Sequence, residues 1–216
     1  MKQNDYDTIF ASSSQSRSAI KIIRISGNNA KKTSSIFNFK RPAPRMFALR
    51  KLTHKNDVID HAPVIWLPKG KSFTGEDTFE IYIHGSVVIE KWIYKILSSY
   101  KNFRLAEPGE FTKRAIINGK MNLIDAEAVN DLIQSETEEQ RALAIKQLNE
   151  GLSIPIKRWR GLLVKSMANI EANIDFSDEG DVAENKISKT TLSKLNKEIT
   201  AAMKSFSIKM KILLIR

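Results

Sequence analysis

Residues 78–83 read Thr-Phe-Glu-Ile-Tyr-Ile, and the tripeptide His-Gly-Ser separates them from an apolar segment at residues 87–100. In the first segment polar and apolar side chains alternate, which is typical of a strand with one face against a core. In the second segment Val88, Trp92 and Ile96 recur at helical spacing. The sequence therefore predicts a strand followed directly by an amphipathic helix, which indicates a domain that mixes both kinds of element.

Three further short apolar runs with turn residues between them precede this segment, at residues 19–26, 46–52 and 62–67. Each has the length and the flanking residues of a strand. One helix is expected from about residue 28 to residue 37, because Ser26-Gly27 breaks the preceding strand. Together these elements predict an N-terminal mixed α/β domain over residues 1–120.

The pattern changes after Pro108-Gly109, where strand signals give way to helical ones. Apolar stripes predict three helices, at residues 125–150, 152–174 and 188–206. Such stripes are buried against one another or against partner helices, so we expect an all-α bundle segment at residues 121–209 and an α+β chain overall. Residues 175–184 carry five acids. This favours a solvated linker over a cation site, because the spacing does not match a calcium loop.

Charge is distributed unevenly along the chain. The formal net charge is +11, and residues 1–118 contribute +10 of it, from 20 basic and 10 acidic side chains. This predicts either a polyanionic partner for the first domain or a charge that serves solubility alone. The absence of cysteine excludes disulfides, thiolate metal sites and cysteine catalysis. No apolar run is long enough for a membrane span and the N-terminus is too polar for a signal peptide, so we expect a cytoplasmic protein without a membrane partner.

Two charged residues stand within strands that are otherwise apolar. Arg24 interrupts the run Ile20-Lys-Ile-Ile-Arg-Ile25 on the same face as Ile20 and Ile22, and Glu80 holds a comparable position in the strand at 78–83. A charge on an apolar face usually has a partner or a ligand. The two residues can form a core ion pair with each other, or they can face a ligand, and the pattern leaves both interpretations open.

Gly70-Lys71-Ser72 is similar to the end of a phosphate-binding loop, but the full pattern fails. In G-x-x-x-x-G-K-[ST] the first glycine would fall on Ile65, inside a predicted strand. We therefore expect no nucleotide-binding loop of this kind, and we assign no catalytic residue and no metal site.

Several longer strings carry a resemblance to a known family. They are Ser72-Phe-Thr-Gly-Glu-Asp77, Leu105-Ala-Glu-Pro-Gly-Glu-Phe-Thr-Lys-Arg-Ala115, Asn118-Gly-Lys120, Asp125-Ala-Glu-Ala128, Asp7-Thr8-Ile9, Ile23-Arg-Ile-Ser-Gly27 and Ile174-Asp-Phe176. In order and spacing they resemble the MnmE family, also called TrmE, of tRNA modification GTPases. The resemblance covers essentially the whole chain, and its first two strings are long and of low degeneracy.

The resemblance implies a fold and a function. Family members have an N-terminal α+β domain that binds a tetrahydrofolate derivative, 5-formyl or methylene, and forms homodimers. A helical domain follows, with a GTPase domain inserted in it. With an MnmG (GidA)-like flavoprotein they build a carboxymethylaminomethyl-type group on the wobble uridine of certain tRNAs. Here residues 210–216 look like the first strand of the GTPase domain. GTP, potassium and magnesium would belong to that missing domain, and we expect the chain alone to be inactive.

The resemblance also places three folate contacts on this sequence, at Arg24, Glu80 and Lys120. A pterin presents an amino group and a ring N–H that a carboxylate can accept together, whereas the glutamate tail of folate suits Arg or Lys. Either Arg24 or Lys120 can hold that tail. The alternative function is a basic RNA-binding module without catalysis, which a steep salt dependence would distinguish from folate binding.

Overall fold

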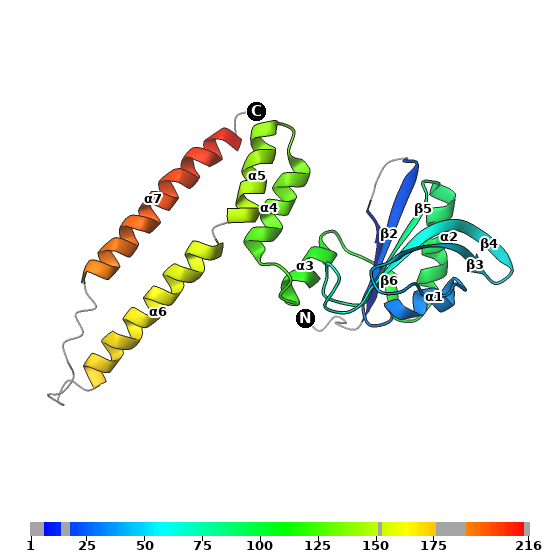
Figure 1. Ribbon diagram of the computed structural model, residues 1–216, viewed down its shortest axis with the longest axis horizontal. Helices are drawn as coiled ribbons and strands as arrows, with labels where there is room; N and C mark the ends of the chain where they lie inside the picture. Colours follow the sequence, from blue (N-terminus) through cyan, green and yellow to red (C-terminus); the bar gives the residue numbers. More distant parts are fainter. Residues whose placement is uncertain (1–6, 14–17, 151–152, 176–188, 214–216) are drawn as a thin grey trace. The chain divides into compact units, whose positions relative to one another are not determined.

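The computed structural model describes residues 7–13, 18–150, 153–175 and 189–213 (Figure 1). The chain forms two compact units, residues 1–121 and residues 122–216. The first contains a sheet and short helices, and the second is helical. The expected α+β fold class is confirmed. The acidic segment expected to be a linker lies mostly at residues 176–188, outside the described residues.

The first unit is built on a six-stranded sheet with the strand order β3-β4-β5-β2-β1-β6. The strands are β1 (Thr8–Ser12), β2 (Ile20–Ser26), β3 (Phe47–His54), β4 (Asp57–Leu67), β5 (Thr78–His84) and β6 (Phe103–Leu105). Neighbouring strands are antiparallel except β1 and β6, which are parallel. The four expected strands are present as β2 to β5. The pattern gave no signal for the short β6 and underestimated the length of β4.

The helices of the first unit are the 3₁₀ helix η1 (Ala30–Lys32), α1 (Thr33–Ile36), α2 (Val87–Ser98) and α3 (Glu110–Ile117). The first two occupy the helix expected after Gly27. The N-terminus of α2 is capped by Ser86, whose Oγ accepts a hydrogen bond from the Val88 N–H at 3.3 Å. The predicted switch from strand to helix is therefore confirmed.

The hydrophobic core lies on one face of the sheet, against α2. Its fully buried members include Ile23 and Ile25 of β2, Phe79, Ile81 and Ile83 of β5, and Ile93 and Leu97 of α2. Lys21 shares the core face of β2, and its Nζ pairs with Glu90 of α2 at 2.6 Å. This buried ion pair was not expected from the sequence.

Arg24 lies on the opposite face of β2. Ile20, on the same face as Arg24, is 59% exposed. Arg24 thus shares a face with Ile20 and Ile22 as the sequence indicated, but this apolar face does not pack against the core. The physical reason is that β2 carries isoleucine on both faces, so alternation alone cannot show which face is buried.

The second unit consists of α4 (Leu123–Gln134), α5 (Glu138–Glu150), α6 (Ser153–Asp175) and α7 (Lys189–Leu213). A single helix was expected over residues 125–150, but the chain breaks at Ser135, whose backbone is extended. The side chain of Gln140 then accepts the N–H groups of Glu136 and Thr137, at 2.8 and 3.2 Å. These polar caps compete with helix continuation, which explains why the apolar stripe did not reveal the break.

The two long helices α6 and α7 share a polar contact. The indole Nε1 of Trp159 donates to Glu198 Oε2 at 3.1 Å, and Arg158 pairs with the same carboxylate. The last helix runs through Leu213, so residues 210–213 are helical and do not begin a strand as expected. Residues 214–216 lie outside the described part. No helix among the described residues is long and apolar enough to cross a membrane.

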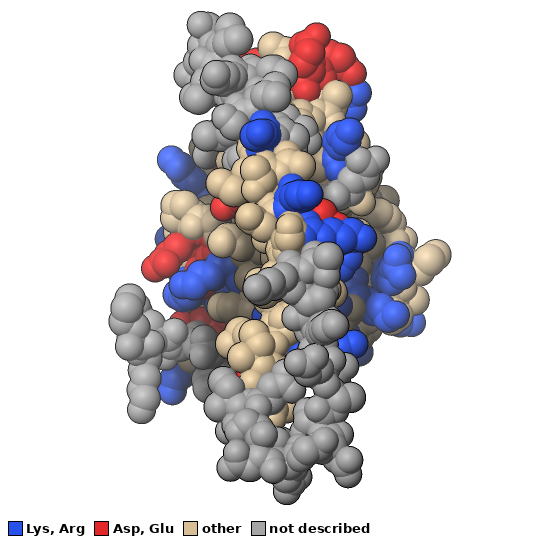
Figure 2. All heavy atoms as spheres, turned by 90° about the vertical axis from the view of Figure 1, so that its left-hand side faces the viewer, with Lys and Arg blue, Asp and Glu red and all other residues tan. Residues whose placement is uncertain are grey.

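The surface charge is not gathered into one patch on the face shown in Figure 2, where Lys and Arg side chains lie in several groups between uncharged ones.

Candidate functional site

Arg24 and Glu80 face each other on neighbouring strands, on the face of the sheet away from the core, here called the second face. The hydrogen-bond register places them in one row with Ala11, Ile65 and Phe47. The Nε and Nη2 atoms of Arg24 both lie 2.8 Å from Glu80 Oε1. The side chains are 29% and 13% exposed. The pair is thus partly accessible, so it satisfies the ion-pair interpretation without excluding a ligand.

Aromatic side chains surround this pair. The guanidinium carbon of Arg24 lies 5.3 Å from the ring centroid of Phe73 and 5.7 Å from that of Phe111, distances typical of cation–π contacts. The hydroxyl of Tyr82 donates to Glu80 Oε2 at 3.0 Å. Burial raises the pKa of Tyr82, and the negative charge of Glu80 raises it further. Tyr82 therefore remains a protonated donor at neutral pH.

Lys120 follows α3 and lies against the loop at residues 68–77. Its Nζ donates to the Gly70 carbonyl at 2.7 Å. A Cβ at Gly75 would stand 3.2 Å from two methylene carbons of Lys120, and Gly75 has a φ of +80°. Among the described residues, Lys120 forms no hydrogen bond or ion pair with Arg24 or Glu80. The same loop nevertheless links Lys120 to Arg24, because it also carries Phe73, whose ring lies against the Arg24 guanidinium.

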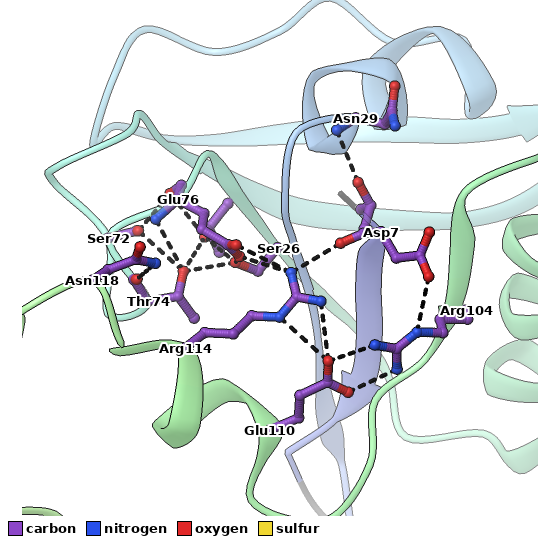
Figure 3. A network of polar contacts seen from close by, with 12 residues as sticks. Asp7, Ser26, Asn29, Ser72, Thr74, Glu76, Arg104, Glu110, Arg114 and Asn118 are labelled. Atoms are coloured by element: carbon purple, nitrogen blue, oxygen red, sulfur yellow. Dashed lines mark hydrogen bonds and ion pairs between the residues drawn. The ribbon is translucent and has the colours of Figure 1, made fainter. Parts of the chain in front are cut away.

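A buried polar network anchors this loop (Figure 3). The hydroxyl of Ser26 lies 2.6 Å from Thr74 Oγ1 and donates to Glu76 Oε2 at 2.8 Å. Arg114 of α3 donates to both oxygens of Glu76, at 3.1 and 3.2 Å, and to the Asp7 carbonyl at 2.9 Å. The network therefore ties the loop to β2, to α3 and to the residue before β1.

Glu110 continues the network on its other side. It accepts two hydrogen bonds from Arg104, at 2.8 and 2.6 Å, and two from Arg114, at 3.3 and 3.0 Å. Burial raises the pKa of Glu110, but the hydrogen bonds from Arg104, the Glu107 N–H and Arg114 outweigh it and lower the pKa to about 2. Glu110 is thus a permanent anion between two cations.

These network residues come from the strings that carried the family resemblance, but sequence reasoning gave them no role. Glu76 and Thr74 belong to the string at 72–77, and Glu110 and Arg114 to the string at 105–115. The available signal was the pair of acids in each string, together with Arg104 just before the second string and Arg114 near its end. Their contacts show that they position the loop and α3, and hence Phe73 and Phe111.

The two units match two family models. The model described as "GTP-binding protein TrmE N-terminus" matches residues 8–120, and the one described as "MnmE helical domain" matches residues 123–213. The chain belongs to the MnmE family. This confirms the resemblance of the motif strings, including those whose side chains form the network.

Individual MnmE proteins are similar over most of the chain. The protein named tRNA modification GTPase MnmE from Bradyrhizobium sp. (strain ORS 278) is 45% identical over 177 residues, which are 81% of this chain and 40% of that protein. The protein of the same name from Caulobacter vibrioides is 40% identical over 205 residues, which are 93% of this chain and 45% of that protein. The chain thus spans less than half the length of these MnmE relatives.

Proposed function

We propose that this chain is the folate-binding part of a tRNA modification GTPase of the MnmE family. The observation that carries the proposal is the Arg24–Glu80 pair on the second face of the sheet. It is partly accessible and lies beside two aromatic rings, and the family resemblance implies folate contacts at both of its residues.

The residues present fit a tetrahydrofolate derivative. A carboxylate has about four acceptor positions, and the contacts with Arg24 and Tyr82 leave room at Glu80 for the amino group and ring N–H of a pterin. Phe73 and Phe111 supply apolar surface beside that position. The cation for the glutamate tail would be Arg24 or Lys120. When bound, such a folate, 5-formyl or methylene, supplies a one-carbon unit.

The activity of the whole protein is part of the same proposal. The relatives are named tRNA modification GTPases, so we infer that the complete protein acts on tRNA in the cytoplasm together with an MnmG-like flavoprotein. GTP, potassium and magnesium would be handled by a part of the protein other than the two units described. Within this scheme the present chain binds and orients the folate.

Homodimer formation belongs to the proposal as well. The second face leaves large apolar side chains exposed, namely Ile20, Phe47 and Leu49. Phe47 and Leu49 are neighbours on this face of β3, and exposed apolar surface of this kind marks association sites. Sedimentation velocity at micromolar concentration should show a dimer, and a clean monomer would contradict this part of the proposal.

Calorimetric titration of 5-formyltetrahydrofolate into the full chain tests the folate site. The informative variant is Glu80→Gln, which keeps shape and volume. We expect it to stay folded and to lose about 1.5 to 3 kcal/mol of binding free energy, the contribution of a charged hydrogen bond. The matched control is Glu90→Gln, which breaks the buried pair with Lys21 on the other face. The control should lower thermal stability and leave folate affinity unchanged.

Two outcomes would contradict the folate site. Unchanged folate affinity in a folded Glu80→Gln variant would remove Glu80 from it. A Glu80→Gln variant that loses as much stability as Glu90→Gln, with no specific loss of binding, would show that Arg24 and Glu80 are a structural ion pair.

A further inference from the structure

The first unit contains a long stretch without any acidic residue. From residue 8 to residue 56 there is no Asp or Glu, whereas there are eleven Lys and Arg residues. Three of these cations are neutralised by acids from later in the chain, namely Lys21 by Glu90, Arg24 by Glu80 and Lys31 by Asp77. The other eight cations of the stretch are not part of these three ion pairs.

Six of the other cations lie between α1 and β4 and are here called the basic edge: Lys40, Arg41, Arg45, Arg50, Lys51 and Lys55. None of them forms an ion pair with any residue that the structure describes. All are exposed except Arg50, which is half-buried. The next acids along the chain are Asp57, at the start of β4, and Asp60, which is buried and hydrogen-bonded to His84. No ion pair within the described part of the chain therefore neutralises the basic edge.

The structure holds the basic edge in place. Arg50 Nε donates to the Lys40 carbonyl at 2.8 Å, which ties the segment before β3 to the strand itself. The Arg41 guanidinium lies 4.3 Å from the ring centroid of Trp66, and the Arg45 N–H donates to the Trp66 carbonyl at 2.8 Å. These contacts reduce the conformational entropy that a ligand would otherwise have to remove.

The arrangement suits an extended anion rather than a compact one. β3 is an outer strand of the sheet, and its residues Phe47–His54 span about 25 Å at the rise of a strand. Lys55 follows this strand in the turn to β4, while Lys40, Arg50 and Lys51 lie at or beside the strand. Cations spread along one edge match successive phosphates of a nucleic-acid backbone, which are contacted by Lys and Arg without reading of sequence.

We propose that the basic edge binds the phosphate backbone of the tRNA substrate. This inference rests on the proposed function, since that function supplies the tRNA. The inference names the surface of this chain that would bind the RNA. The residues of this surface differ from the three proposed folate contacts.

The test measures binding of an unmodified tRNA transcript to the full chain by fluorescence anisotropy, between 50 and 200 mM salt. The informative variant replaces Lys40, Lys51 and Lys55 by Gln, because these side chains are exposed and form no hydrogen bond or ion pair with a described residue. The matched control replaces Lys91, Lys95 and Lys101 by Gln. These are exposed lysines on and after α2, so both variants lose the same net charge.

The basic-edge variant should bind the transcript at least tenfold more weakly at 150 mM salt. Its slope of log affinity against log salt should fall by about 2 to 3, since each phosphate contact contributes about 0.7 to 0.9. The control variant should keep the wild-type slope. Equal losses in both variants would show a net-charge effect and overturn the proposal, as would absence of RNA binding by the wild-type chain.

Two further measurements separate this proposal from others. The first is binding to vesicles of phosphatidylserine and phosphatidylcholine. If the wild-type chain and the control variant bind these vesicles, and the basic-edge variant loses vesicle binding but still binds RNA, the edge belongs to a membrane surface. That result would overturn the RNA proposal. Titration of 5-formyltetrahydrofolate into the same variants tests the proposed function by itself. If the salt slopes of RNA binding differ between the variants as expected but no protein binds folate, the folate site is contradicted and the basic edge is supported.

Discussion

The two units of the chain bury their apolar side chains to very different extents. In the sheet unit, large side chains such as Phe10, Phe79, Ile81 and Leu97 are fully buried. In the described part of the helical unit, the buried apolar residues are Ala128, Ala144 and Leu195. Met167 of α6 is 60% exposed although it belongs to the predicted apolar stripe. The sheet unit therefore completes its own core, whereas the helical stripes require further apolar surface to be covered.

The largest difference in stability between the two units is expected from a pair of glycine substitutions. A Cβ at Gly85 would stand 1.5 Å from the Ser18 carbonyl oxygen, so the backbone must move. We expect Gly85→Ala to cost more than about 4 kcal/mol and to unfold the sheet unit. Gly161, within α6, has open space around it. Gly161→Ala should stabilise that helix by up to about 1 kcal/mol.

Hydrogen exchange followed by mass spectrometry measures both effects, because peptides report each unit separately. Gly85→Ala should remove protection from β2 and β5, and Gly161→Ala should slow exchange in α6. Wild-type protection of β5 in Gly85→Ala would contradict the close approach of Ser18.

Large-to-small substitutions in the two units should also differ in their cost to stability. Ile81→Ala removes a fully buried side chain from the sheet core and should cost about 2 to 5 kcal/mol. Met167→Ala removes an exposed one and should change stability by less than about 0.5 kcal/mol. Urea unfolding followed by circular dichroism checks the two midpoints. Comparable losses in both variants would mean that the helical unit has a core of its own.

The stability of the sheet unit should depend on acid pH through Glu110. The pKa of Glu110 is about 2 in the folded chain, below the ordinary value of 4.5. The unfolded chain therefore binds the proton first, so this stability is fully present above about pH 4.5 and is lost as the pH falls toward 2. The expected contribution is about 3 kcal/mol.

Thermal melts between pH 2 and 7 measure this contribution. Glu110→Gln should be less stable at neutral pH and show a smaller drop on acidification. The matched variant is Glu138→Gln, because the pKa of Glu138 is also lowered, by Arg141, but on an exposed helix surface. It should melt like the wild type. An unchanged pH profile in Glu110→Gln would contradict the network's role.

We expect this chain not to bind GTP. The chain has no G-x-x-x-x-G-K-[ST] string, and Ile65, where its first glycine would fall, is a member of β4 paired with Glu80. Titration with a fluorescent GTP analogue should therefore show no binding, and stoichiometric binding would contradict this expectation.

The sequence predicted those features that depend on local pattern. The strands β2 to β5 and the helix α2 have periodicities that belong to one element each, and the motif strings led to the family. Features set by tertiary contacts were missed. Alternation in β2 could not show that Lys21, rather than Arg24, faces the core. Nor could it show that Arg114 of α3 pairs with Glu76, because these two residues come from separate segments.

The folate-site proposal is tested most directly by hydrogen exchange of the full chain with and without saturating 5-formyltetrahydrofolate. The proposal predicts slower exchange in the loop at 68–77, in the strands that carry Arg24 and Glu80, and in the segment at 117–120. It predicts no change in α5, α6 or α7. Protection confined to those helices, or no protection of the loop at 68–77, would contradict the proposal that the sheet unit alone forms the folate site.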